Sequence, residues 1–154
     1  SSELFKMEEQ FAFIGEAKNV GQKREFEFLK TIALKYLNAH YQWGGKSPFG
    51  IDCSGYTQMV FKISGYPIQR DASQQAQQGR LVKDFVERKP GELLFFKDDH
   101  GKVIHVGILL ESDKVIHASG RVRIDAYDEK GIYNTEVKEY THYGSHIRRI
   151  LPDT

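Results

Sequence analysis

The sequence predicts an α+β domain in which N-terminal helices pack on a small antiparallel β-sheet. In the first half of the chain, apolar residues recur at the spacing of one helical face over 25–37 and again after residue 53. From residue 90 onward, short apolar runs are separated by turns rich in glycine, proline and aspartate. Helices that come first and strands that follow are the order expected of an α+β fold.

The composition excludes several function classes. With 154 residues, 40% hydrophobic and 28% charged, the chain is typical of one globular domain with its own core. A net charge of +1 provides no basic field for nucleic acid, so we expect no nucleic-acid partner. No apolar run is long enough to span a bilayer. The single cysteine rules out an internal disulfide and a cysteine-rich zinc site, and we predict no metal and no cofactor.

The first residues read differently from the rest of the chain. Residues 11–14 alternate only briefly, and 15–21 are turn-like. We interpret residues 1–24 as a linker or the remnant of an upstream domain, and residues 25–154 as the folded domain. The chain starts with Ser rather than Met, so we expect a processed or trimmed chain.

Three helices are predicted in the first half of the domain. The first spans 25–37, and the second begins at Cys53, directly after a loop rich in glycine and proline. The third begins at Asp71, where Gln74 can complete a capping box and Gly79 can end the turn. The apolar positions that outline the first two helical faces are Phe26, Leu29, Ile32, Ala33, Tyr36, Leu37, Tyr56, Met59, Val60 and Ile63.

The pattern of the second half of the chain predicts antiparallel strands joined by tight turns. The strands are expected over 92–96, 103–110, 115–118, 121–126 and 145–150. The run over 103–110 is so apolar that it suits a central, buried strand.

Cys53 is the most informative residue of the sequence. A cysteine in the first turn of a helix lies at the positive end of the helix dipole, which favours the nucleophilic thiolate over the thiol. We therefore interpret Cys53 as a candidate catalytic nucleophile.

Two histidines on the predicted strands are candidate partners of Cys53. His105 interrupts an apolar strand, where an unpaired ring would cost about 1–3 kcal/mol. It is either a core histidine bonded to the backbone or the base that takes the thiol proton. His117 is the candidate third member, which would orient the first imidazole; alternatively, it is a strand-end histidine. A simple hairpin places His117 opposite about Ile108, so contact with His105 needs strong twist or a bulge, for which Gly107 is suited.

Other residues near Cys53 have two readings each. Tyr41 could donate to an oxyanion or pack the helix end, whereas packing is the first interpretation for Trp43. Asp52 could contact substrate, although capping the Cys53 helix is the commoner role. Arg70 and Asp71 form either a capped helix start or an ionic substrate contact.

The remaining histidines carry less information. They lie in polar or turn-like surroundings and are expected at the surface: His40, His100, His142 and His146. The last two have the i, i+4 spacing of a metal pair, but the residues between them are not helical and no carboxylate nearby completes a site.

Six motifs occur in a characteristic order. They are Tyr41-Gln42-Trp43-Gly44-Gly45, Asp52-Cys53-Ser54-Gly55, Arg70-Asp71-Ala72-Ser73-Gln74-Gln75, Lys89-Pro90-Gly91-Glu92-Leu93-Leu94-Phe95-Phe96, Ile104-His105-Val106-Gly107 and Ile116-His117-Ala118-Ser119-Gly120. Together they resemble the NlpC-type cell-wall cysteine peptidases of bacteria, over roughly residues 25–151. Each motif alone is weak, but six in the right order are highly specific.

The resemblance implies a papain-like fold with its parts in permuted order and a Cys–His–His triad. Cys53 matches the nucleophile, His105 the general base and His117 the orienting residue, while Tyr41 matches the tyrosine near the oxyanion. The matching substrate-binding candidates are Asp52, Ser54, Trp43, Arg70, Asp71 and Ser73.

The resemblance also implies a substrate and a setting. The substrates are peptidoglycan stem peptides, cut between γ-D-glutamate and meso-diaminopimelate or L-Lys, and Asp71 would lie near the ammonium of a free N-terminal L-Ala. Small β-barrel targeting domains often lie upstream in such enzymes. We expect a bacterial protein that acts outside the cytoplasm, with recycling of fragments inside the cell as an open alternative. The rival functions are a thiol amidase or acyltransferase on another acyl substrate, and a non-catalytic wall-binding module.

Overall fold

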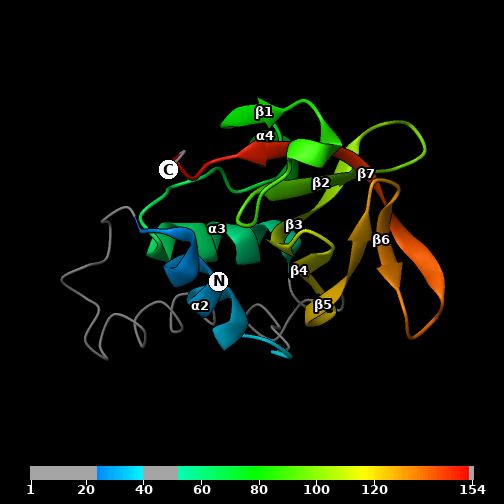
Figure 1. Cartoon of the computed structure of the whole chain (residues 1–154), viewed down its shortest axis with the longest axis horizontal. Coiled ribbons are helices and arrows are strands. Elements are labelled where there is room, and N and C mark those ends of the chain that lie inside the picture. Colours follow the sequence, from blue (N-terminus) through cyan, green and yellow to red (C-terminus); the bar gives the residue numbers. More distant parts are fainter. Residues whose placement is uncertain (1–23, 40–51, 153–154) are drawn as a thin grey trace.

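The computed structural model of the chain describes residues 24–39 and 52–152, and it places helices against an antiparallel sheet (Figure 1). The helical elements are α2 (Phe26–Lys35), α3 (Cys53–Ile63), α4 (Ala72–Gln75) and the 3-10 turn η4 (Phe85–Glu87). The strands are β1 (Arg80–Val82), β2 (Leu93–Lys97), β3 (Val103–Glu111), β4 (Lys114–Ser119), β5 (Arg121–Asp128), β6 (Gly131–Asn134) and β7 (Glu139–Arg149).

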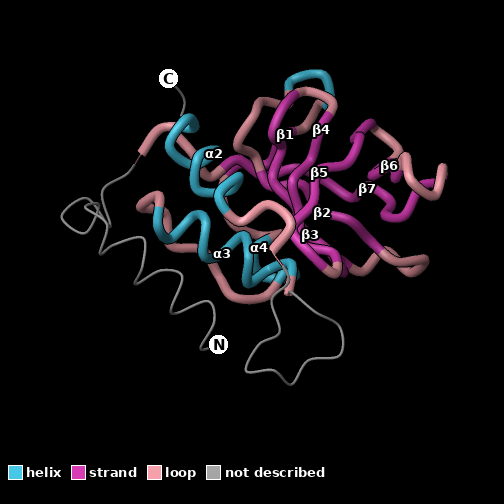
Figure 2. Tube along the Cα trace, turned by 90° about the horizontal axis from the view of Figure 1, so that it is seen from below, coloured by secondary structure: helices cyan, strands magenta, loops and turns pink. Residues whose placement is uncertain are grey.

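The sheet closes on itself. Its strand order is β1-β7-β2-β3-β4-β5-β6, and β6 also pairs with β7. Every pairing is antiparallel. Strands β2 to β7 therefore form a ring, and β1 extends the sheet from β7. Helices α2 and α3 gather on one side of this ring, as the view in Figure 2 shows.

The helices and one face of the strands share a hydrophobic core. The apolar side of α3 contributes Tyr56, Met59 and Val60, which are fully buried against β3 and β4. The hydroxyl of Tyr56 donates a hydrogen bond of 2.7 Å to the carbonyl oxygen of Ala33 and so ties α3 to α2. Burial of these side chains fixes the start of α3 against the sheet.

A second apolar cluster lies on the other face of the strands. Its members are Val82, Leu94, Phe96, Leu109, Val115, Tyr127, Ile132 and Ile147. Side chains alternate between the two faces of a strand. Along β3, Val106 and Ile108 therefore face the helices, whereas His105 lies on the same face as Leu109. A strand buried on both faces explains why this segment is so uniformly apolar.

The structure confirms the predicted α+β architecture but not the size of the sheet, which has seven strands. Two short strands, β1 and β6, were not predicted, and β7 begins at Glu139 rather than at residue 145. The segment 139–144 mixes polar and aromatic residues without an apolar run, and it is a strand because it pairs with β2 and β6. The third helix ends at Gln75, well before Gly79.

The predicted linker is a part that the structure does not test. Residues 1–23 of the expected linker lie outside the described residues. Of the helices in the described part of the chain, none has the length and apolar character needed to cross a membrane.

Candidate active site

Cys53 is the first residue of α3, as the sequence predicts. Asp52 is the N-cap, and its carboxylate accepts hydrogen bonds from the backbone N–H groups of Ser54, at 3.0 Å, and Gly55, at 3.2 Å. The capping interpretation of Asp52 is therefore confirmed. It places the thiol at the N-terminal end of a helix that is packed rigidly on the sheet.

The environment of Cys53 favours the thiol rather than the thiolate. Burial raises the pKa of Cys53 and the negative charge of Asp52 adds to this, although a hydrogen bond from the Val106 backbone lowers it in part. The expected effect of the helix end is outweighed, because burial removes the solvation that a thiolate needs. At neutral pH, Cys53 is protonated and requires a base.

Three of the predicted substrate-binding residues bond to one another beside Cys53. Arg70 forms an ion pair with Asp52 and donates a hydrogen bond of 3.0 Å to the hydroxyl of Ser54. That hydroxyl in turn donates to Asp52 at 2.8 Å. Burial raises the pKa of Asp52, but the hydrogen bonds from Arg70 and Ser54 outweigh it, and the pKa lies below its ordinary value. The positive charge of Arg70 and the negative charge of Asp52 thus lie together at the N-terminal end of α3.

Asp71 and Ser73 lie at the start of α4, where both are exposed. Asp71 and Gln74 form the capping box that the sequence predicts. The short helix is held against α3 by the buried Gln75, whose amide donates to the carbonyl of Ser54 at 3.0 Å and accepts from Thr57 at 2.8 Å. This connection brings the 70–73 segment beside the Cys53 end of α3.

His105 and His117 are brought together as the sequence predicts. His105 Nε2 and His117 Nδ1 are 2.8 Å apart, and the two rings meet edge to face. Both are buried. Among the described residues no hydrogen bond joins Cys53 to His105; the sulfur lies near the backbone of Val106, the next residue on β3, which lowers the pKa of Cys53 in part.

A bulge at Gly107 was one expected cause of the contact between the two histidines, and the structure shows no such bulge. Gly107 pairs regularly with Leu94 on β2, and the register shift between β3 and β4 falls between Leu109 and Glu111. A Cβ added at Gly107 would lie 3.0 Å from the Cβ of His117. Because Gly107 has no side chain, His117 can extend diagonally across the strand pair toward His105. Rings are long enough to span the distance between such diagonal neighbours.

Sequence reasoning missed Asp125, which completes the chain of hydrogen bonds. Its Oδ2 lies 2.7 Å from His117 Nε2. Arg123 holds the same carboxylate with two hydrogen bonds, of 2.8 and 3.0 Å. The signal was present in the sequence, because Asp125 is a charged residue between the apolar Ile124 and Ala126 of a predicted strand.

Two histidines that we expected at the surface are half-buried. His142 stacks on His105, with ring centroids 4.2 Å apart, and His146 stacks on Phe95 at 5.0 Å. The prediction failed because β7 packs its alternate side chains inward. His105, His117 and His142 are called the histidine cluster below.

Burial lowers the pKa of every ring in the histidine cluster. For His105 the pKa lies well below its ordinary value, because burial and the two neighbouring rings disfavour a charged imidazole. Burial also lowers the pKa of His117, partly offset by the hydrogen bond to Asp125. The pKa of His142 falls to about 4, chiefly through burial. The cluster is therefore uncharged at neutral pH.

The other predicted site residues fall in two groups. Tyr41, Trp43 and His40 lie outside the described residues, whereas His100 is exposed as expected. No group of metal-binding side chains occurs within 24–39 and 52–152.

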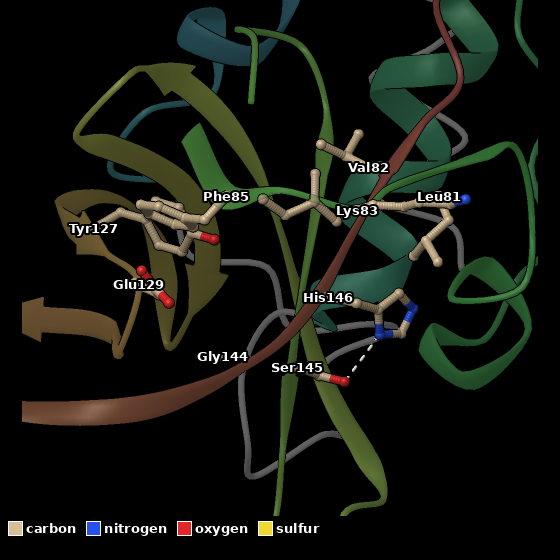
Figure 3. A pocket seen from close by; sticks show the side chains of 10 residues that line it. Leu81, Val82, Lys83, Phe85, Tyr127, Glu129, Gly144, Ser145 and His146 are labelled. Atoms are coloured by element: carbon tan, nitrogen blue, oxygen red, sulfur yellow. Dashed lines mark hydrogen bonds between the residues drawn. The ribbon is translucent and has the colours of Figure 1, made fainter. Parts of the chain in front are cut away.

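Several hollows lie among the described residues, and one of them is lined by His142 together with Phe96 and Ile104. A groove lined by Ser73, Ala76, Val103 and His146 borders α4. A separate pocket of about 320 Å³ has Phe85 and Tyr127 on one side and Leu81 and His146 on the other (Figure 3). The second pocket holds none of the residues that the sequence predicts for the site.

Comparison with known proteins agrees with this arrangement. The NlpC/P60 family profile matches residues 38–141. A gamma-D-glutamyl-L-lysine dipeptidyl-peptidase of Bacillus subtilis is 40% identical over 99 residues, which are 63% of this chain and 33% of that protein. The chain thus spans about a third of the length of this curated relative.

Solved structures show the same fold. The crystal structure of an NlpC/P60 family protein from Bacillus cereus has a TM-score of 0.68 at 30% identity, covering 86% of this chain and 42% of that one. The NlpC/p60 domain of the peptidoglycan hydrolase SagA has a TM-score of 0.55 at 33% identity, covering 66% and 89% respectively. The family profile extends over more than half of the sequence, from just after α2 into β7, and the chain belongs to the NlpC/P60 family.

Proposed function

We propose that this chain is a cysteine peptidase domain that hydrolyses peptidoglycan stem peptides at the bond between γ-D-glutamate and a diamino acid. The observation that carries the proposal is the position of Cys53. Its sulfur lies near the backbone of Val106, the neighbour of His105, and His105 is itself bonded to His117. A thiol, a neutral base and a residue that orients the base are the parts that acyl transfer through a thioester needs.

The proposed reaction begins with both partners neutral, since the pKa of Cys53 is raised by burial and that of His105 is lowered by it. His105 takes the thiol proton as the sulfur attacks the γ-carbonyl carbon. The oxyanion is held by the N–H of Cys53 and by the hydroxyl of Tyr41. The C–N bond then breaks, and His105 gives its proton to the leaving amine.

Water completes the cycle. His105 removes a proton from water, the oxygen attacks the thioester carbon, and the acid product leaves as the sulfur recovers its proton. A small movement of the Cys53 side chain from Val106 toward the imidazole is part of this proposal. Such contacts often tighten only when substrate is bound.

The proposed substrate class follows from the relatives and from the charges beside Cys53. The Bacillus subtilis relative is named for the γ-D-glutamyl-L-lysine bond, and SagA is named as a peptidoglycan hydrolase. The Arg70–Asp52 pair offers charges of both signs to the charged ends of a stem peptide. Asp71 would receive the ammonium of N-terminal L-Ala, while Ser54, Ser73 and Trp43 would line the path of the peptide.

The proposed setting is the bacterial cell envelope, outside the cytoplasm. The order of helices before strands fits a permuted papain-like fold. Small β-barrel targeting domains upstream in the whole protein would bring the enzyme to the wall.

The test is direct hydrolysis of defined peptides. The chain is incubated with L-Ala-γ-D-Glu-meso-diaminopimelate and, separately, with its L-Lys counterpart, and L-Ala-γ-D-Glu is sought by mass spectrometry. We expect release of the dipeptide, and its loss in Cys53→Ala. The matched control is Ser112→Ala, which changes a side chain of similar size in the exposed β3–β4 turn.

The outcomes separate the rival functions. Hydrolysis that survives Cys53→Ala contradicts the mechanism. Turnover of simple amides or esters without turnover of either stem peptide favours the amidase or acyltransferase. Sedimentation with purified wall and no turnover of any acyl substrate favours the binding module.

A further inference from the structure

A buried carboxylate that the proposed reaction does not use lies at the end of the histidine chain. Asp125 Oδ2 is 2.7 Å from His117 Nε2, and His117 Nδ1 is 2.8 Å from His105 Nε2. The side chains of Asp125 and His117 are 5% and 1% exposed. Water therefore has little access to either hydrogen bond, and the protein groups themselves decide where the protons lie.

The charge of Asp125 is secured by Arg123. The guanidinium donates to both carboxylate oxygens of Asp125, at 2.8 and 3.0 Å. Burial raises the pKa of Asp125, but the hydrogen bonds from His117 and Arg123 outweigh it, and the pKa lies below its ordinary value. Asp125 is thus an ionised group that can only accept hydrogen bonds.

An obligate acceptor fixes the tautomer of the ring that it contacts. Because Asp125 cannot donate, the proton between it and His117 must reside on His117 Nε2. Burial keeps the pKa of His117 lowered, so that the ring is neutral and carries only this proton. His117 Nδ1 then has a free lone pair and must accept.

The hydrogen bond between the two histidines fixes the tautomer of His105 in the same way. His117 Nδ1 accepts, so His105 Nε2 must carry the proton of the bond between them. His105 is neutral because its pKa lies well below the ordinary value, chiefly through burial. Its remaining nitrogen, Nδ1, is left unprotonated and can act as a base.

We propose that Asp125 is a positioning residue that acts through His117 to fix His105 as the Nε2–H tautomer, with Nδ1 presented as the base. The inference deepens the proposed function and rests on it for the identity of the group that Nδ1 deprotonates. Arg123 keeps Asp125 ionised, because its two hydrogen bonds to the carboxylate oppose transfer of the His117 proton to Asp125. When His105 gains a proton during the reaction, the negative charge of Asp125 also stabilises the imidazolium.

The tautomers are measured directly by long-range ¹H–¹⁵N NMR of the histidine rings in the ¹⁵N-labelled chain, near neutral pH. We expect His105 and His117 both as Nε2–H forms in the wild type. In Asp125→Asn the amide oxygen can still accept from His117, so the tautomers stay and only the charge is lost. In Asp125→Ala the acceptor is gone, and we expect the Nδ1–H form of His117 to become populated.

Turnover of the stem peptide provides the second readout. Kinetic constants should show kcat falling in the order wild type, Asn, Ala, by on the order of 100-fold for Ala, with KM changed by less than about twofold. A residue with a purely structural role would not produce the tautomer change. Asp84→Ala, which removes an exposed carboxylate at the start of η4, is the matched control and should leave tautomers and kcat unchanged.

Failure of this inference is distinguishable from failure of the proposed function. A wild-type His117 that carries its proton on Nδ1 overturns the role of Asp125, whatever the enzyme cleaves. Wild-type tautomers together with wild-type kcat in Asp125→Ala also overturn it. Because the wild-type spectrum alone decides the first point, the test does not depend on the folding of a variant. Absence of stem-peptide hydrolysis with the expected tautomers and their expected change in Asp125→Ala would overturn the proposed function and leave the tautomer assignment standing.

Discussion

The imidazole of His142 lies flat against that of His105, with ring centroids 4.2 Å apart and planes inclined by 27°. Two charged imidazoles would repel each other at this separation. The pKa of His142 falls to about 4, mainly through burial, and that of His105 is also well below its ordinary value, so the rings stack as neutral groups. The cluster is therefore a feature of the folded state that acid should oppose.

We expect the free energy of unfolding to decrease as the pH falls from about 6.5, the ordinary histidine pKa, toward about 4. In this pH window the histidines are protonated in the unfolded chain but not in the folded cluster. The free energy of unfolding therefore rises with pH, by at most about 1.4 kcal/mol per pH unit for each ring. Urea unfolding across this range measures the effect. His142→Phe keeps an aromatic ring on His105 but removes one titrating group, and should make the slope shallower. An unchanged slope in that variant, or an equal change in the exposed control His100→Phe, would contradict the argument.

A second prediction concerns Gly107, which lies on β3 with His105 and packs closely against His117 on β4. In Gly107→Ala the new methyl would meet Val115 Cγ2 at 2.6 Å and His117 Cβ at 3.0 Å. We expect a loss of about 1–3 kcal/mol in the free energy of unfolding, since overpacking forces neighbouring side chains aside. We also expect reduced kcat, because His117 is displaced from His105. Ile104→Ala on the same strand, where the side chain is 53% exposed, should change stability by less than about 0.5 kcal/mol. Equal stability of the two variants would count against the close packing.

The state of the Cys53 thiol yields a third prediction. Burial raises its pKa, and so does the charge of Asp52. We expect the rate of iodoacetamide labelling in the free protein to rise with a midpoint above about pH 8.5, the ordinary cysteine value. Asp52→Asn retains a good N-cap residue but removes the charge, so the midpoint should move down. Asp84→Asn is the control. A labelling rate already at its plateau below about pH 7 would mean instead that a thiolate–imidazolium pair forms before substrate arrives.

The fourth prediction concerns Arg70, which pairs with Asp52 and bonds to Ser54. Because this pair is exposed, Arg70→Gln should lower the free energy of unfolding by less than about 1 kcal/mol. If these residues hold the substrate, the same change raises KM for the stem peptide far more than it lowers kcat. Lys114→Gln breaks another exposed ion pair, with Glu111 at 3.7 Å, and should leave both constants unchanged. A KM that does not respond to Arg70→Gln would remove Arg70 from the substrate site.

The parts of the site that the sequence predicted are those encoded locally. The start of α3 follows from Asp52, from the loop before it and from the apolar spacing after it, all within a few turns of chain. The capping box of α4 is local in the same way. His105 and His117 were predicted as partners from their places in apolar strands and from motifs that resemble those of a known family. Of the two expected causes of their contact, strong twist or a bulge at Gly107, the bulge is absent.

The parts that were missed depend on strands pairing across the sheet. His142 reads as a surface residue in sequence, and it reaches His105 only because β2 lies between β7 and β3. The contact of Asp125 with His117 depends on the register of the β4–β5 hairpin. In that register His117 pairs with Arg123, and Asp125 lies two residues beyond Arg123 on β5. The raised pKa of Cys53 depends on how much protein covers the sulfur, which no local pattern reports.

The pairing of β6 with both β5 and β7 has a consequence for the alignment of the imidazoles. A strand displaced by one residue would turn each of its side chains to the opposite face. In an open sheet, all the strands on one side of a ladder can slip together and disrupt that ladder alone; here the strands form a closed ring, and any such slip must break two ladders. Side chains contributed by β3, β4, β5 and β7 are thus aligned by a property of the whole circuit, which no single turn or contact provides.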